Sequence, residues 1–139
     1  MPAVDRTLII VKPDAVARGL LGEIVARFER RGLRLAAGEL RTLDEATARA
    51  HYAEHDGKPF FPRLVEFITS GPVFVGVLQG TDNVFAVVRT MMGTTNPKDS
   101  APGTIRGDLA TEMSENLIHG SDSPESAQRE IALFFPDLA

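Results

Sequence analysis

The hydrophobic positions along the chain follow two kinds of pattern, and the first predicts strands. Nearly continuous apolar runs occupy residues 7–12 (TLIIVK) and 73–80 (VFVGVLQG). Runs of this length predict strands that are buried on both faces. Residues 34–40 (RLAAGEL) and 116–119 (NLIH) predict weaker or shorter strands. Four strands are therefore expected, which is enough for one sheet.

The second pattern predicts helices between and after these strands. Apolar side chains recur three or four residues apart over residues 19–32, 44–55, 60–68, 82–93 and 123–135. Gly32 is a stop signal for the first helix, and Asp44 is expected to cap the second. Ser123, followed by a proline, is expected to begin the last helix. The helix that begins at Asp82 and Asn83 is also expected to be capped.

One segment has neither pattern. Residues 94–115 are rich in Pro, Gly, Ser and Thr, and predict a long loop of the kind that is usually functional or mobile. The order of elements predicts the α/β class, as an α+β sandwich. The simplest match is a ferredoxin-like β-α-β-β-α-β core with a four-stranded antiparallel sheet and additional helices. A chain of 139 residues has the size of one domain, so a single domain over residues 1–139 is expected.

The composition excludes several kinds of chemistry. The chain has no cysteine, which removes disulfides, thiolate zinc sites and cysteine nucleophiles. It shows no signal-like start and no apolar run of the ~18 residues that a membrane span needs, so a cytoplasmic protein without a membrane partner is expected. The net charge of −4 argues against general nucleic-acid binding but permits a local basic pocket.

A histidine and a glutamate stand out near the end of the chain. His119 ends the fourth predicted strand, and a neutral imidazole is a good nucleophile near pH 7. Glu130 lies on or beside the apolar stripe of the last helix, where a carboxylate needs a partner such as His119 or Ser121. A histidine held by a carboxylate has a fixed tautomer. The alternatives are a satisfied or surface histidine and a solvated glutamate.

Three cations occupy positions where α/β proteins build sites. Lys12 ends a buried strand, Arg89 lies near the end of a helix, and Arg106 belongs to the long loop. Each alone could be a surface residue, whereas together they would suit a polyphosphate. The sequence lacks both G-x-x-x-x-G-K-[ST] and G-x-G-x-x-G. A nucleotide would therefore have to be bound by side chains.

Two further motifs allow functional interpretations. Residues 51–55 (HYAEH) match H-x-x-E-H, so His51 and His55 could share a zinc ion, although an exposed helical face is the default interpretation. In the sequence PFF, Phe61 fits the core stripe of its helix, which turns Phe60 away from the core. An exposed phenylalanine is either an ordinary surface residue or a platform on which a base stacks.

Several motifs in order resemble the nucleoside diphosphate kinase family over nearly the whole chain. They are VKPDAVARGLLGEI near the start, HY at 51–52, PFF at 59–61, SGPV at 70–73, TNP at 95–97, PGTIRGD at 102–108 and NLIHGSDS at 116–123. The last motif is long and specific. The resemblance implies a phosphotransferase that moves the γ-phosphoryl group of a nucleoside triphosphate to a nucleoside diphosphate. It implies a ping-pong cycle through a phosphohistidine, with broad base specificity.

The resemblance also assigns roles to individual residues. It implies that His119 is phosphorylated and that Glu130 and Ser121 orient its ring, with Tyr52 nearby. It implies a set of nucleotide ligands with distinct roles: Lys12 and Asn116 for the ribose hydroxyls, Phe60 for the base, and Arg89, Thr95 and Arg106 for the phosphates. No protein ligand to a metal is implied, because Mg²⁺ would be bound mainly through the nucleotide phosphates.

The resemblance extends to assembly. Many members of the family are hexamers, so a homo-oligomer is expected, with a hexamer favoured over a tetramer. The short segment after residue 135 makes the size of the oligomer the open part of this expectation. Two other classes compete with the enzyme. One is a nucleotide-sensing ferredoxin-like module without chemistry, and the other is a zinc peptidase that uses the HYAEH motif.

Overall fold

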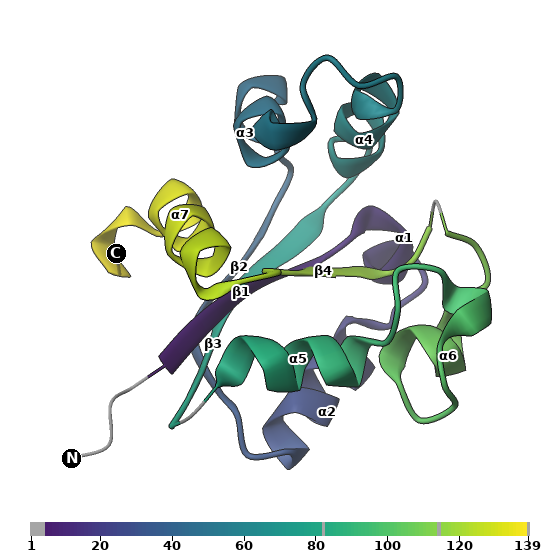
Figure 1. Cartoon of the computed structure of the whole chain (residues 1–139), viewed down its shortest axis with the longest axis vertical. Coiled ribbons are helices and arrows are strands. Elements are labelled where there is room, and N and C mark those ends of the chain that lie inside the picture. Colours follow the sequence, from purple (N-terminus) through teal and green to yellow (C-terminus); the bar gives the residue numbers. More distant parts are fainter. Residues whose placement is uncertain (1–4, 82, 114, 139) are drawn as a thin grey trace.

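The four expected strands form one sheet. The computed structural model describes residues 5–81, 83–113 and 115–138. Its strands are β1 (Asp5–Val11), β2 (Arg34–Arg41), β3 (Val73–Gly80) and β4 (Ile118–Gly120). They pair in the order β2-β3-β1-β4, and each pair is antiparallel (Figure 1). This arrangement confirms the predicted four-stranded antiparallel sheet with a ferredoxin-like core.

Helices connect the strands and follow the last one. Between β1 and β2 lie α1 (Pro13–Ala17) and α2 (Leu21–Arg30). Between β2 and β3 lie α3 (Glu45–His51), the short 3₁₀ turn η1 (Ala53–His55) and α4 (Phe61–Ile68). Between β3 and β4 lie α5 (Val84–Met92), η2 (Pro97–Asp99) and α6 (Ile105–Leu109). After β4 come α7 (Pro124–Phe134) and η3 (Pro136–Leu138).

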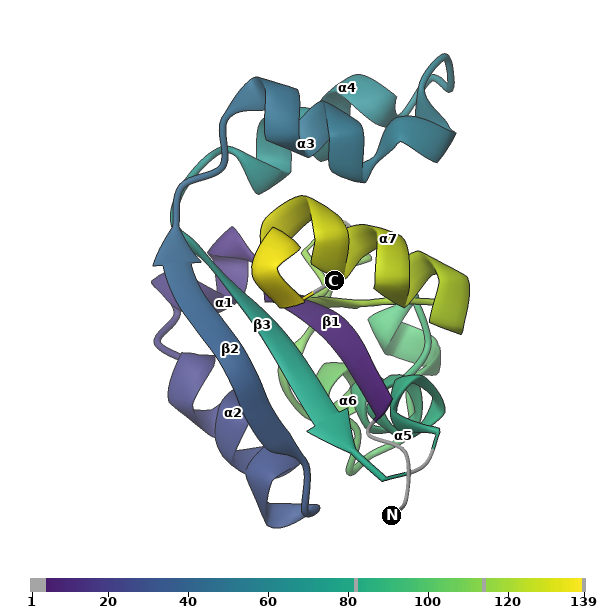
Figure 2. The same cartoon turned by 90° about the vertical axis from the view of Figure 1, so that its left-hand side faces the viewer.

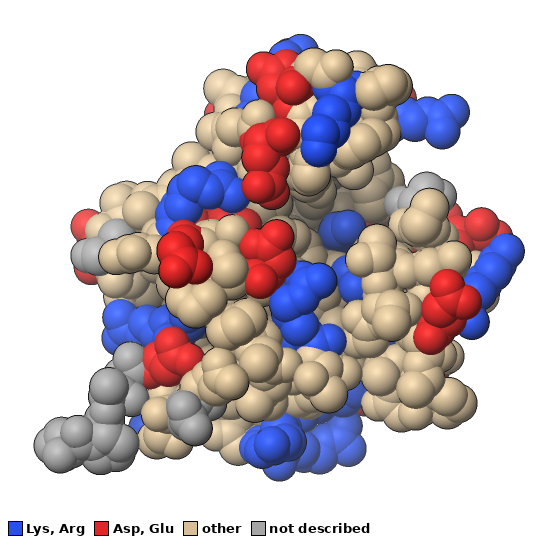
Figure 3. Space-filling model, in the orientation of Figure 1, with Lys and Arg blue, Asp and Glu red and all other residues tan. Residues whose placement is uncertain are grey.

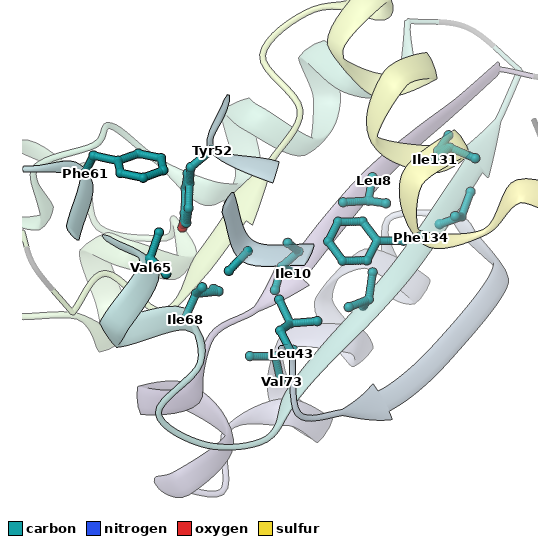
Figure 4. Close-up of a cluster of buried hydrophobic side chains, with 13 residues drawn as sticks. Leu8, Ile10, Leu43, Tyr52, Phe61, Val65, Ile68, Val73, Ile131 and Phe134 are labelled. Carbon is teal, nitrogen blue, oxygen red and sulfur yellow. The ribbon is translucent and has the colours of Figure 1, made fainter. Parts of the chain in front are cut away.

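The central strands β1 and β3 are buried on both faces over most of their length, which explains their long apolar runs. Alternate residues of a strand point to opposite faces, so Leu8 and Ile10 belong to one core cluster while Ile9 and Val11 belong to the other. Helices α2 and α5 pack on the second cluster, and α3, α4 and α7 pack on the first (Figure 2). Figure 4 shows the first cluster, in which Phe134 of α7 lies beside Leu8.

The ends of two helices agree with the sequence signals, and one does not. The side chains of Asp44 and Ser123 cap α3 and α7 as predicted, by accepting hydrogen bonds from backbone N–H groups. The first N–H of α5, that of Val84, instead donates to the carboxylate of Asp5, 2.7 Å away. Asn83 has a left-handed backbone and makes no capping hydrogen bond, so the prediction of a local cap is wrong there. Asp82, the other residue of that prediction, lies outside the described residues.

Three predicted boundaries need correction. The helix expected over 44–55 ends at His51, because the chain tightens into η1. The strand expected over 116–119 begins later, at Ile118, because Leu117 has a positive φ of 76°. Residues 94–115 are not one irregular loop, since η2 and α6 interrupt them, and the side chain of Thr104 caps α6. Short capped turns of this kind have too few residues to show apolar periodicity.

Candidate active site

A cavity of about 1010 Å³ lies beside the end of β1, below the α3–α4 pair. Ten residues received a role from the family resemblance, and nine of them line this cavity: Lys12, Tyr52, Phe60, Arg89, Thr95, Arg106, Asn116, His119 and Glu130. The tenth, Ser121, is buried and bonds to Glu130. In Figure 3 the surface is hollowed below the α3–α4 pair, and Lys and Arg side chains gather in and below the hollow. The structure therefore brings the predicted residues together in one place.

His119 is held by β4 and by a carboxylate from α7. It pairs with Ile10 in the antiparallel ladder, which places it on the edge strand β4, next to the central strand β1. Its Nε2 atom lies 2.8 Å from Oε1 of Glu130. An ionised carboxylate only accepts hydrogen bonds, so Nε2 carries the proton and donates it. Nδ1 is then the ring nitrogen with a free lone pair, and it makes no hydrogen bond to any described residue.

Glu130 is buried, with an exposed fraction of 3%, as its place on the apolar stripe of α7 predicted. Its Oε1 atom also accepts a hydrogen bond of 2.8 Å from the hydroxyl of Ser121. Its Oε2 atom lies 3.5 Å from a guanidinium nitrogen of Arg129. The carboxylate thus has the partners that a buried charge requires. The predicted contacts of Glu130 with His119 and Ser121 are both present.

The three cations converge on the cavity, and the pKa values of Lys12 and Arg106 are lowered there. Burial, and then the charge of Arg106, lower the pKa of Lys12 to about 8. Burial, and then the charge of Arg89, lower the pKa of Arg106 to about 10. Like charges packed this closely oppose each other, and a bound anion would relieve the repulsion. The cavity is therefore electrostatically suited to a polyphosphate.

Lys12 and Asn116 are directly linked. The ammonium group of Lys12 donates to Oδ1 of Asn116 over 2.9 Å, and the amide of Asn116 donates to the backbone carbonyl of Thr95. The next residue, Leu117, has the positive φ noted above, and its N–H donates to the carboxylate of Asp14. Non-glycine residues in this conformation occur where the surroundings impose it, often at functional sites. The strain here lies between Asn116 and His119.

Arg106 is more deeply embedded than a loop cation is expected to be. It is only 5% exposed, although it belongs to the segment predicted as a loop. Its guanidinium donates to four backbone carbonyls, those of Gly93, Thr94, Asn116 and Ile118. A guanidinium has five N–H groups, so about one remains for a ligand. Arg106 therefore also connects Gly93 and Thr94, which precede η2, to Asn116 and Ile118 at the start of β4.

The opposite side of the cavity is aromatic and more exposed. Phe60 is 46% exposed, as predicted from its direction away from the core. The ring of His55 lies 5.3 Å from that of Phe60, and the ammonium group of Lys58 lies 5.8 Å from it. Tyr52 is buried between the rings of His51 and His55, and burial raises the pKa of its hydroxyl to about 12. Tyr52 therefore stays neutral near pH 7.

This geometry agrees with comparisons with known proteins. Residues 5–139 match the family model described as nucleoside diphosphate kinase. The chain belongs to the nucleoside diphosphate kinase family. It is 62% identical to the nucleoside diphosphate kinase of Thermus thermophilus over 131 residues, which are 94% of this chain and 95% of that protein. It is 59% identical to that of a Parafrankia species, covering 97% of this chain and 98% of the relative.

Solved structures of the same family have the same fold. The nucleoside diphosphate kinase of Halobacterium salinarum in complex with CDP superposes with a TM-score of 0.92. That protein is 52% identical, and the match covers 96% of this chain and 88% of the other. A family protein from Babesia bovis is 46% identical and also has a TM-score of 0.92. The sequence-based expectation of an enzyme of this family, a nucleotide-binding phosphotransferase, is confirmed.

His51 lies at the site, although no role there was predicted for it from the sequence. His51 belongs to the HYAEH motif, whose default interpretation was an exposed helical face. That interpretation is wrong for His51, which is 2% exposed and lies against the ring of His119. The available signal was its position three residues after Ala48, which is also buried. Residues three apart share a helix face.

The lining also offers groups that could accompany a metal. The family supports a divalent metal bound together with the nucleotide. Asp122 and Glu54 line the cavity and supply carboxylate oxygens, the donors that Mg²⁺ prefers. One atom each of His51, His119 and Glu130 also lies within 4.8 Å of the others. His55, the partner of His51 in the zinc interpretation, does not belong to that group and lies beside Phe60 instead.

The described residues contain no helix that is both long and apolar enough to cross a membrane. This finding agrees with the absence of a long apolar run in the sequence.

Proposed function

We propose that this protein transfers the γ-phosphoryl group of a nucleoside triphosphate to a nucleoside diphosphate through a phosphohistidine on His119. The observation that carries the proposal is the pair formed by His119 Nε2 and Glu130 Oε1, 2.8 Å apart. This bond keeps the proton on Nε2 and the lone pair on Nδ1. Nδ1 is therefore the atom proposed to attack phosphorus.

The chemistry balances as two displacements at phosphorus. Nδ1 forms a bond to the γ-phosphorus while the bond from that phosphorus to the bridging oxygen breaks, and the nucleoside diphosphate leaves with the electron pair. The proton on Nε2 stays with the Glu130 hydrogen bond. A second nucleoside diphosphate then attacks the phosphorus with a terminal oxygen, and the bond to Nδ1 breaks. Splitting the transfer in this way gives a ping-pong cycle.

The chain's residues supply position and charge for both displacements. Arg89, Arg106 and Thr95 are proposed to bind the phosphates, and Lys12 and Asn116 the ribose hydroxyls. The guanidinium of Arg89 is fixed by a 3.0 Å hydrogen bond to the carbonyl of Gly120, the residue after His119. Holding reactants in line and stabilising charge on phosphate oxygens are the main contributions to phosphoryl transfer. Mg²⁺ bound with the nucleotide would supply further neutralisation of phosphate charge.

Base specificity is proposed to be broad. Phe60 offers a flat ring at the open side of the cavity, and every base has a face that can stack on it. Selective recognition would instead need hydrogen bonds to the edge of the base. The complex of the Halobacterium salinarum relative with CDP supports nucleotide binding as the common property.

A labelling experiment tests the proposal. Incubation with γ-labelled ATP and Mg²⁺ should give a labelled protein whose bond is labile in acid and stable in base. Unlabelled nucleoside diphosphate should then remove the label as triphosphate. The His119→Ala variant should bind nucleotide but take up no label. Nucleotide binding by the wild-type protein without any label would favour a sensing module, and normal exchange by the variant would contradict the role of His119.

We also propose a cytoplasmic homo-oligomer, with a hexamer favoured over a tetramer, in which each chain forms one domain. The edge strand β2 supports assembly because it exposes two leucines, Leu35 at 37% and Leu40 at 56%. Exposed apolar residues on a sheet edge are often covered by another chain. Light scattering on the purified protein would measure the mass. A mass of one chain at micromolar concentration would contradict the proposal.

A further inference from the structure

His51 is a buried histidine for which the proposed reaction has no role. It is the last residue of α3 and is 2% exposed. Its ring meets the ring of His119 edge to face, with 4.6 Å between the ring centroids and 85° between the planes. The rings of Tyr52 and Phe134 lie 4.6 and 5.7 Å from it. His51 is therefore fixed between the core and the ring of His119.

The two ring nitrogens of His51 make no hydrogen bond to any described residue. Both nitrogens are buried. A buried polar atom without a partner is destabilising, so a carbon ring of the same shape would fit this position at lower cost. Burial, followed by the nearby His119 and Arg129, lowers the pKa of His51 to about 2. The ring is accordingly neutral near pH 7 and does not take up a proton there.

The ring of His119 needs a second restraint besides Glu130. The covalent bond from Cβ holds one end of the ring, and the hydrogen bond from Nε2 holds the far end. A ring held only at these two ends can still rock about the line that joins them. Such rocking moves Nδ1 away from the direction of the phosphorus. An edge-to-face contact from the side opposes this motion, and ring pairs at these distances prefer that arrangement.

We propose that His51 is a positioning residue, whose neutral ring packs against the ring of His119 and keeps Nδ1 directed into the cavity. The flat shape of the ring performs this role, and its nitrogens do not. The inference rests on the proposed function, because it takes His119 as the nucleophile. It adds a third side to the support of that ring, beside the main chain of β4 and the carboxylate of Glu130.

A series of three substitutions separates shape from polarity. His51→Phe keeps a flat ring, His51→Leu keeps most of the volume without a ring, and His51→Ala removes both. Phosphorylation of each variant by ATP is measured in a single turnover, and nucleotide affinity is measured separately. We expect His51→Phe to transfer within about threefold of the wild type and to melt at the same or a higher temperature. We expect His51→Ala to transfer ~100-fold more slowly with nearly unchanged affinity, the size of effect known for small misplacements. His51→Leu should lie between.

A control separates positioning from loss of stability. Leu43→Ala opens a cavity in the same core cluster, and Leu43 makes no part of the proposed nucleotide site (Figure 4). This variant should melt at a lower temperature and still transfer at the wild-type rate. The ring nitrogen that carries the phosphoryl group gives a second readout, which phosphorus NMR identifies in the isolated phosphoenzyme. In His51→Ala a fraction of the phosphoryl group should appear on Nε2, whereas in His51→Phe all of it should remain on Nδ1.

Several outcomes would overturn the inference. Wild-type transfer by His51→Ala would show that the contact is not needed. A folded His51→Phe as slow as His51→Ala would show that a nitrogen is needed rather than a flat ring. If His51→Phe does not fold, a wild-type rate in His51→Leu would still contradict the role of ring shape. A wild-type protein that takes up no label would instead contradict the proposed function itself, so the two failures are distinct.

Discussion

The two sides of the cavity are built differently. On the side proposed to bind the ribose and the phosphates, called the phosphate side below, Lys12, Arg106 and Asn116 are linked by hydrogen bonds to each other or to nearby backbone carbonyls. On the base side, Phe60 is 46% exposed and lies beside the ring of His55 and the ammonium group of Lys58. Hydrogen bonds fix the side chains of the phosphate side, whereas the base side presents an exposed aromatic ring. A protein built in this way is suited to hold one reacting group in place while it accepts different bases.

Changes to the support of His119 should have the largest effect. Glu130→Gln replaces an acceptor-only group with an amide, which can present an N–H group to Nε2 and so allow the wrong tautomer. We expect single-turnover phosphorylation to slow ~100- to 1000-fold. Nucleotide affinity should change little, because Glu130 holds the histidine and not the ligand. An equal loss of affinity would show that Glu130 acts mainly on the shape of the cavity.

The next largest effect should come from the hydrogen bonds of Arg106 to the backbone of the phosphate side. Arg106→Lys keeps the charge but cannot reach four carbonyls at once, so it should lower the free energy of unfolding by ~2–3 kcal/mol. Chemical denaturation measures this change. Arg89→Lys is the matched control, because Arg89 makes one such bond, to the carbonyl of Gly120, and should lower stability less. Equal losses in the two variants would contradict this role of the Arg106 hydrogen bonds.

Some features of the cavity could be predicted from the sequence, and others could not. The burial of Glu130 followed from its spacing with Ala127 and Phe134 on α7, and the exposure of Phe60 followed from the inward position of Phe61. Such one-helix arguments need only the period of the helix. The motifs of the family then placed the phosphate ligands in one site. The contacts that tie this site to the fold were not predictable in the same way.

Long-range contacts explain what the sequence analysis missed. The cap of α5 comes from Asp5, the first residue of the neighbouring strand β1, and not from a residue close in the sequence. The four carbonyls that Arg106 contacts belong to two segments that only the folded chain brings together. His51 meets His119 because α3 packs on the same sheet face as α7. Periodicity within a single element carries no information about these neighbours.

The third prediction tests the base side. Phe60→Ala should weaken binding of nucleoside triphosphates ~10-fold, from the loss of stacking. The loss should be similar for the four common bases, and the rate of transfer from the bound state should be nearly unchanged. Competition binding with ATP, GTP, CTP and UTP measures it, and Phe60→Tyr serves as the control that keeps a ring. Loss of binding for one base alone would contradict broad specificity.

The smallest effect should be a fall of kcat/KM at high pH, caused by the loss of the charge on Lys12. The lowered pKa of Lys12, about 8, means that the free enzyme loses this cation as the pH rises through 8. The kcat/KM for nucleotide should therefore fall to about half near pH 8, whereas kcat should be less affected because bound phosphate favours the charged form. Lys12→Arg should remove the fall, since arginine stays charged. A profile that is unchanged between these two proteins would contradict the assignment.

The lowered pKa of Lys12 also affects stability. Stability should rise with pH, whereas kcat/KM should fall. Between pH 8 and the usual lysine value near 10.5, the unfolded chain binds a proton at Lys12 that the folded chain does not. Stability therefore rises with pH through this window as far as Lys12 is concerned. Lys12→Met should remove that rise. Thermal melting at several pH values measures it in the two proteins.

In the proposed mechanism, Glu130 holds the proton of His119 on Nε2, so that Nδ1 accepts the phosphoryl group. The most direct measurement is the NMR spectrum of the isolated phosphoenzyme, which distinguishes the two phosphorylated nitrogens of a histidine. We expect a single signal from Nδ1-phosphohistidine, which disappears when nucleoside diphosphate is added. A signal from Nε2-phosphohistidine, or a phosphorylated residue other than His119, would contradict it.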